Sequence, residues 1–155
     1  MHYVFLLAIG IGIVAGLRAL LAPAIVAWAA HFGWLNLHGS PLAFVGSTAA
    51  VAIFSVFAIV ELVGDKLPQT PKRTALAPLL ARILMGGLCG ASLCVSAGKS
   101  LLAGALVSGM GGVIGAFVGY EIRRRLVNNL RVKDLFVAVW EDLMAIALAC
   151  FFVSR

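Results

Sequence analysis

The order of apolar and polar positions along the chain predicts a series of long hydrophobic helices joined by short polar loops. Five apolar runs, each near the ~20 residues that cross a bilayer, occupy residues 3–30, 43–64, 75–97, 101–121 and 135–153. A helix satisfies its backbone hydrogen bonds internally, as a segment in lipid must. The pattern therefore predicts an all-α membrane protein, a polytopic bundle of about five transmembrane helices.

The first apolar run is longer than the others and contains helix-disturbing residues. Three glycines precede Arg18, and Pro23 follows it. A proline inside a helix removes one backbone hydrogen bond and clashes with the preceding turn. We therefore predict a kinked first helix, with the bend between Arg18 and Pro23.

Composition supports one membrane domain over residues 1–155. Of the 155 residues, 63% are hydrophobic and only 12% are charged, whereas soluble domains have about 25% charged residues. The formal net charge of +6 could indicate nucleic-acid binding. The basic residues, however, gather between the apolar runs, where they act as topology signals and contact anionic lipid. We expect membrane lipids as partners and no nucleic acid.

Lysine and arginine are distributed unequally between the two sides of the predicted bundle. One side has only Lys99 and Arg155. The other side has eight basic residues, in the loops after the second and fourth runs: Lys66, Lys72, Arg73, Arg123, Arg124, Arg125, Arg131 and Lys133. Basic loops stay in the cytoplasm. With five spans, this places the N-terminus in the cytoplasm and the C-terminus on the opposite side.

Several charged residues lie inside the apolar runs or at their edges. At the bilayer centre a charged side chain costs at least ~2.5–3.5 kcal/mol. Glu61 and Asp65 are one helical turn apart. Arg82, Glu141 and Asp142 each lie roughly 10 Å from the cytoplasmic side, at 1.5 Å per residue. These charges form either an ion-pair network between helices or a polar pocket that binds an ion or solute. The candidate residues are Arg18, Glu61, Asp65, Arg82, Glu141 and Asp142.

Small residues recur at helical spacing in the fourth run. Gly111, Gly115 and Gly119 form a stripe on one face. In lipid such stripes let two helix backbones approach closely. The stripe predicts helix packing, either inside one subunit or against a second copy, and we expect a homo-oligomer.

The sequence lacks the motifs of the common enzyme classes. The three cysteines, Cys89, Cys94 and Cys150, have no metal-ligand spacing with a histidine. His31 and His38, in a predicted outer loop, could bind a metal or sense protons, but solvated loop histidines are commoner. No nucleotide-binding loop and no Ser/His/Asp set is present. We expect no enzyme activity, no cofactor and no metal.

Three segments resemble a known family. They are "GLRALLAPAIVAWAAHFGWLNL" (16–37), "VELVGDKLP" (60–68) and "NNLRVKDLFVAVWEDLMAIALA" (128–149). They are similar to the small bacterial membrane proteins grouped as domain of unknown function 4126. The resemblance covers nearly the whole chain and implies a location in the bacterial inner membrane. It also implies a polar centre made of Glu61, Asp65, Lys66, Pro68, Glu141 and Asp142.

Two function classes fit these observations. The first is a small transporter or permease for an ion or small polar solute, which would use the charged layer facing the cytoplasm. The second is a non-transporting membrane module that binds a lipid or a partner protein, with the charges as a structural salt-bridge network. A water-filled pocket that reaches the charged layer would support the transporter, and its absence would support the non-transporting module.

Overall fold

The computed structural model describes residues 3–64, 75–130 and 133–155. These residues form helices joined by loops and contain no strand. The elements are α1 (Tyr3–Leu17), α2 (Leu21–His31), the short 3-10 helix η1 (Ala43–Gly46), α3 (Thr48–Gly64), α4 (Leu76–Ser96), α5 (Leu101–Leu130) and α6 (Asp134–Val153). The predicted all-helical architecture is confirmed.

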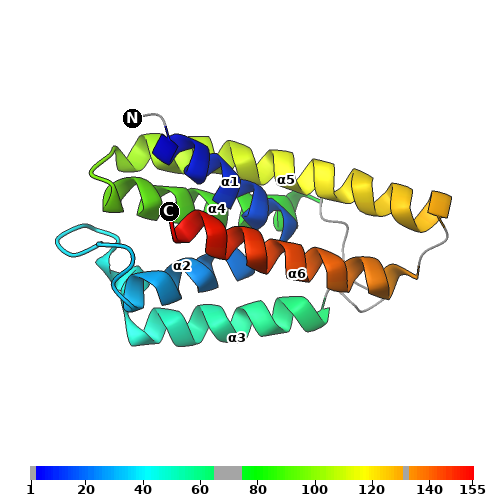
Figure 1. Ribbon diagram of the computed structural model, residues 1–155, viewed down its shortest axis with the longest axis horizontal. Helices are drawn as coiled ribbons and strands as arrows, with labels where there is room; N and C mark the ends of the chain where they lie inside the picture. Colours follow the sequence, from blue (N-terminus) through cyan, green and yellow to red (C-terminus); the bar gives the residue numbers. More distant parts are fainter. Residues whose placement is uncertain (1–2, 65–74, 131–132) are drawn as a thin grey trace.

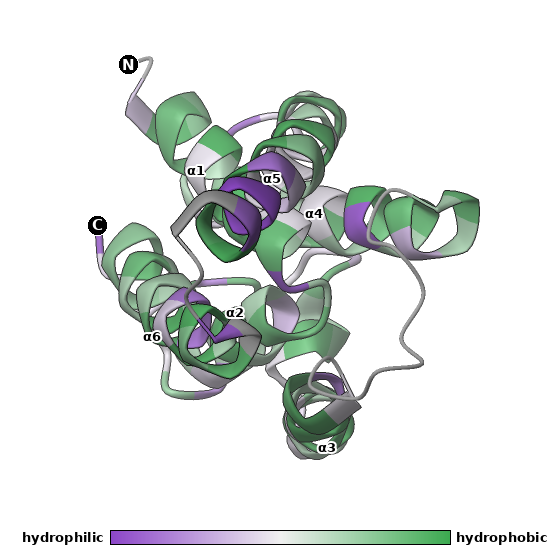
Figure 2. Ribbon diagram, turned by 90° about the vertical axis from the view of Figure 1, so that its right-hand side faces the viewer, coloured by the Kyte–Doolittle hydropathy of each residue, from purple (hydrophilic) through white to green (hydrophobic). Residues whose placement is uncertain are grey.

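Three of the described helices, α4, α5 and α6, are long and apolar enough to cross a membrane. The helices α1, α2 and α3 are apolar but shorter. Hydrophobic residues, green in Figure 2, run along all of the helices, and many large hydrophobic side chains are exposed, as expected for a protein surrounded by lipid. The chain therefore has the character of a membrane protein, while the count of five spans stays a prediction.

The first apolar run forms two separate helices, where the sequence predicted one kinked helix. Helix α1 ends at Leu17, and α2 begins at Leu21. Pro23 lies in the first turn of α2, where the N–H that proline lacks would have had no helical partner. At 1.5 Å per residue, α1 is roughly 22 Å long and α2 roughly 16 Å. Each is shorter than the ~30 Å hydrocarbon core.

The chain reverses direction between these two helices. Val4 and Leu7, in the first turns of α1, line the same cavity as Trp34 and Leu35, which follow α2. The start of α1 and the end of α2 therefore lie at the same end of the molecule, as Figure 1 shows. We call this pair of helices the α1–α2 hairpin.

The hairpin changes the expected relation between the two termini. In Figure 1, α1 begins and α6 ends at the same end of the bundle. Ser154 and Arg155 line the cavity that Val4 also lines. The two ends of the chain thus lie at the same end of the bundle. The sequence-based prediction of termini on opposite sides of the membrane assumed that residues 3–30 cross once, and the orientation of the termini in a membrane stays a prediction.

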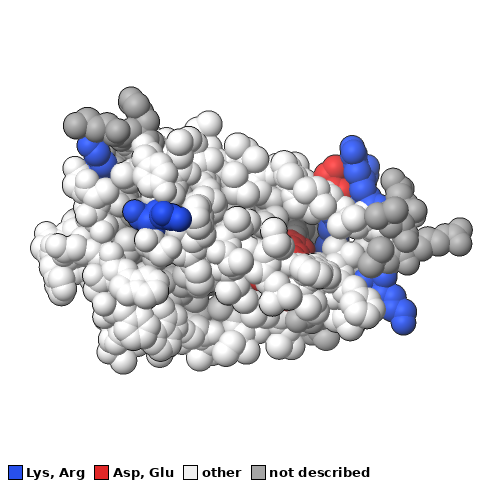
Figure 3. Space-filling model, in the orientation of Figure 1, with Lys and Arg blue, Asp and Glu red and all other residues white. Residues whose placement is uncertain are grey.

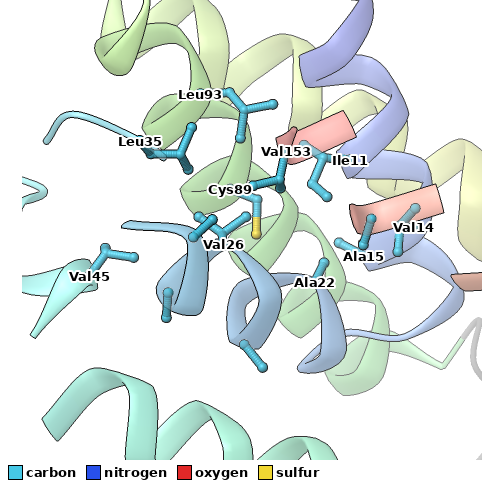
Figure 4. Packing of buried hydrophobic residues seen from close by; sticks show 14 of the residues in the cluster. Ile11, Val14, Ala15, Ala22, Val26, Leu35, Val45, Cys89, Leu93 and Val153 are labelled. Atoms are coloured by element: carbon cyan, nitrogen blue, oxygen red, sulfur yellow. The ribbon is translucent and has the colours of Figure 1, made fainter. Parts of the chain in front are cut away.

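The interior is built around α1, which lies against both α4 and α5, while α3 packs mainly on α2 at the edge of the bundle. The buried core is formed mostly by small and branched side chains. Figure 4 shows Ile11 and Val14 of α1, Val26 of α2, Cys89 of α4 and Val153 of α6 converging on it. The hairpin is therefore a central part of the core.

Glycines allow α1 and α5 to approach at backbone distance. A Cβ added at Gly111 would lie 2.5 Å from the Ile9 carbonyl oxygen, and one added at Gly115 would clash with the Ile13 carbonyl oxygen. Two residues of the predicted stripe thus pack within the subunit. The third, Gly119, is buried and lines a groove between α5 and α6.

We expect Gly115→Ala to destabilise the protein by about 1–3 kcal/mol, the usual cost of overpacking a tight contact. Gly109→Ala is the matched control on the same helix. Its new Cβ would meet only Ile83 at 3.5 Å, an ordinary contact, and alanine favours helix by up to about 1 kcal/mol. Thermal unfolding in detergent compares the two variants. Equal melting temperatures would contradict the close α1–α5 packing.

Candidate functional site

Four buried or half-buried charged side chains surround the turn of the hairpin at residues 18–20. They come from four different parts of the chain. Arg18 lies at the turn itself, Glu61 on α3, Arg82 on α4 and Asp142 on α6. We call this set the helix-break cluster.

Glu61 binds the backbone at the start of α2. The Ala19 N–H donates to Oε1 of Glu61 over 2.7 Å, and the Leu20 N–H donates to Oε2 over 2.9 Å. The first N–H groups of a helix have no partner within the helix, and the helix dipole favours an anion at this end. Glu61 therefore provides, from a distant helix, the capping group that this helix start lacks locally.

Arg82 binds the backbone at the other side of the break. Its Nε donates to the Gly16 carbonyl oxygen over 2.8 Å, and its Nη1 lies 3.5 Å from the Pro78 carbonyl oxygen. The last carbonyls of a helix are also without helical partners, and a cation is favourable there. Arg82 is 4% exposed, so this contact lies inside the protein.

Arg18 and Asp142 form the ion pair of the cluster. Nη2 of Arg18 lies 2.5 Å from Oδ1 of Asp142. Arg18 is fully buried, and Asp142 is 7% exposed. A buried charge is tolerated only with a close partner. The pair joins the hairpin turn to α6.

The helix-break cluster surrounds the break between α1 and α2, which is buried inside the bundle. Irregular backbone within a membrane is tolerated only where protein buries it or where it lines a water-filled cavity. Here side chains of α3 and α4 satisfy backbone groups on both sides of the break. The formal charges of its two arginines and two carboxylates balance.

A scan against family models decides which family the sequence represents. The model described as domain of unknown function (DUF4126) matches residues 5–154, nearly the full length. The chain belongs to the DUF4126 family. This confirms the resemblance seen in the three sequence segments. A search of curated proteins returns no match, and neither does a search of solved structures.

The structure of this DUF4126 protein brings together most of the predicted site residues. Arg18, Glu61, Arg82 and Asp142 meet at the hairpin turn. Asp65, Lys66 and Pro68 lie outside the described residues. Glu141, although next to Asp142 in sequence, faces the groove between α5 and α6.

The pairing of the charges differs from the sequence-based prediction in two respects. Arg18 takes the Asp142 carboxylate as its partner, while Arg82 binds the Gly16 carbonyl oxygen of the backbone. Arg123, which the sequence marked only as a topology signal, lies 3.9 Å from Glu141. The break between α1 and α2, where Arg82 binds the Gly16 carbonyl and Glu61 binds the Ala19 and Leu20 N–H groups, was not predicted. These contacts join residues 41 or more positions apart, so local patterns could not reveal them.

No group of three or more possible metal ligands occurs among the described residues. His31 instead contacts the Gly46 carbonyl oxygen through Nδ1 at 3.0 Å, and its ring lies near Trp28 and Phe32. These contacts join the end of α2 to η1. They support a structural role for His31 in the loop at this end.

Proposed function

We propose that this protein is a small transporter or permease for an ion or small polar solute, with the helix-break cluster as its closed gate. The observation that supports this most is the pair of helix ends buried at depth and held by charged side chains. Interrupted helices whose ends meet within the membrane form the binding sites of many secondary transporters. Paired charges inside a membrane commonly mark ion or proton pathways.

The gate would open by exchange of partners. Glu61 holds two N–H groups of the α2 start, and Asp142 holds Arg18. A solute that enters the helix-break cluster would compete for one of these partners. Because each contact joins the hairpin to a different helix, losing one frees the hairpin turn to move relative to α3 or α6.

The alternative is a module that does not transport, in which the cluster only holds the helices together. The burial of Arg18, Arg82 and Asp142 favours it, since a completed network needs no solute. Lipid or protein binding would then be the function. Absence of flux, together with full biological activity of a variant without the charges, would support this alternative.

Flux measurements test the proposal directly. The protein is reconstituted in liposomes that contain a pH-sensitive dye or a K⁺, Na⁺ or Cl⁻ gradient. We expect faster dissipation of at least one gradient than in empty liposomes. Glu61→Gln, which removes the charge but keeps the size, should change its rate or its pH dependence. If no gradient is affected by the wild-type protein, the ion-conducting form of the proposal fails.

The hairpin also implies a membrane topology. We propose that α3, α4, α5 and α6 cross the membrane while the hairpin enters and returns. The basic residues Arg123, Arg124 and Arg125 are near the end of α5, and Lys133 directly precedes α6. These two helix ends lie opposite the termini in Figure 1, and Figure 3 shows basic side chains, in blue, at this end. The positive-inside rule then places both termini outside the cytoplasm. The bacterial inner membrane remains the expected location, and a homo-oligomer remains the expected assembly.

Reporter fusions check this topology. A reporter active only outside the cytoplasm should be active when joined after Arg155 and also when joined before Tyr3. A reporter active only in the cytoplasm should be silent at both positions. Opposite results at the two ends would mean that residues 3–31 cross the membrane, contrary to the hairpin.

A further inference from the structure

A groove separate from the helix-break cluster opens between α5 and α6, beside the end of α1. Its volume is about 480 Å³. Leu17, Ile122, Trp140, Met144 and Leu148 form much of its wall. Figure 3 shows acidic and basic atoms side by side in a recess of this face. The groove is therefore mostly apolar with a small charged area.

The charged area is formed by one residue from each helix. Arg123 of α5 and Glu141 of α6 lie 3.9 Å apart, and their side chains are 18% and 12% exposed. A guanidinium has five N–H donors and a carboxylate has two acceptor oxygens, so each can hold several partners at once. The groove thus presents a positive and a negative group next to each other above an apolar wall.

The apolar wall continues onto the outer surface of the bundle. Trp140 is 67% exposed, and Ile122 and Met144 are each 53% exposed. In a membrane these side chains contact acyl chains. The charged pair lies toward the basic end of the molecule, where Arg124 and Arg125 project, and tryptophan favours the interface between headgroups and hydrocarbon. A molecule in the groove would have its polar part at headgroup level.

We propose that this groove binds one phospholipid whose headgroup carries both a phosphate and a primary ammonium, as in phosphatidylethanolamine. The phosphate accepts hydrogen bonds from Arg123, the ammonium donates to Glu141, and an acyl chain covers Trp140 and Met144. The opposite charges of the pair match those of the headgroup. A purely anionic headgroup would meet repulsion from Glu141, and a choline headgroup cannot donate an N–H hydrogen bond.

Lipid-binding measurements on the full-length protein test this site. Protein stripped of lipid in detergent is titrated with phosphatidylethanolamine, phosphatidylcholine or phosphatidylglycerol of equal chain length. Native mass spectrometry and the shift in melting temperature report binding. We expect the ethanolamine lipid to bind most tightly. Arg123→Gln should weaken its binding about tenfold, the size of one lost charge-assisted contact.

Three further variants make the result specific. Glu141→Gln should abolish the preference for ethanolamine over choline and improve binding of phosphatidylglycerol. Arg125→Gln is the matched control, because it removes the same charge from a side chain that is 71% exposed and paired with Glu121. It should leave the order of the three lipids unchanged. Met144→Trp, at an exposed position, should fill the groove and weaken binding of all three lipids.

Several results would overturn the proposal. They are equal binding of the three lipids, tightest binding of phosphatidylglycerol to the wild-type protein, and equal effects of Arg123→Gln and Arg125→Gln. The last would show a general effect of surface charge. Melting temperatures without lipid establish that each variant is folded. If Arg123→Gln or Glu141→Gln does not fold, unchanged lipid binding by Met144→Trp would still refute the site.

Discussion

Arg18→Leu is expected to lower the free energy of unfolding by roughly 3–5 kcal/mol, the usual cost of removing one member of a buried ion pair. The substitution leaves the Asp142 carboxylate, 7% exposed, without the guanidinium that now lies 2.5 Å away. Thermal or denaturant-induced unfolding in detergent measures the loss. Arg124→Leu is the control, because the Arg124 side chain is 56% exposed and pairs with Glu121 at the surface.

Adding Asp142→Leu to Arg18→Leu should restore much of the lost stability. Replacing both members of a buried ion pair by apolar residues is often neutral or stabilising. The double variant thus separates the cost of an orphaned charge from the value of the pair. If the double variant is less stable than Arg18→Leu alone, Asp142 has a more important partner than Arg18.

Glu61→Ala should be the second strongly destabilised variant. It leaves the N–H groups of Ala19 and Leu20 without their acceptor, and each unsatisfied buried group costs about 1–3 kcal/mol. Glu121→Ala is the matched control. Glu121 pairs with Arg124 and Arg125 at the surface, and such pairs contribute about 0–1 kcal/mol.

Glu61→Gln should lie between the wild type and Glu61→Ala. Its single carbonyl oxygen can accept one of the two N–H groups, while its NH₂ group faces the other donor. Melting temperatures in detergent give the order. Equal stability of Glu61→Ala and Glu121→Ala would contradict the capping role of Glu61.

The helices could be predicted from the sequence because apolar runs in a membrane protein have few alternatives to helix. The runs at 75–97, 101–121 and 135–153 correspond to α4, α5 and α6, although α5 extends to Leu130. Its last turns contain Arg123, Arg124 and Arg125, which the sequence placed in a loop. Hydropathy marks the apolar part of a helix, and a helix can continue into the polar region.

The hairpin was missed although the sequence contains a signal for it. Arg18 divides the run at 3–30 into parts of 15 and 12 residues, each too short for a ~20-residue span. Pro23 was interpreted as a kink, whereas proline is also common in the first turn of a helix. Whether α2 continues in the direction of α1 or reverses depends on the contacts of Glu61 and Arg82. These are properties of the folded bundle.

The inward charges were the most informative part of the sequence. Their cost in lipid predicts that they have partners, and four of them meet at one place. Their roles could not be predicted, because Glu61 and Arg82 bind backbone groups that exist only at the helix break. The glycine stripe predicted close packing, and Gly111 and Gly115 supply it against α1.

The most direct test of the central claim is solute flux through the Arg18→Leu/Asp142→Leu double variant in liposomes, beside the wild-type protein. The double variant should be folded, as its melting temperature will show, but it lacks two charges of the proposed gate. If the helix-break cluster is a closed gate, wild-type protein dissipates a gradient slowly, and the folded double variant, whose hairpin turn has lost its ion pair with α6, dissipates the gradient faster. Flux that continues unchanged in the double variant would contradict the account and leave this ion pair a structural role alone.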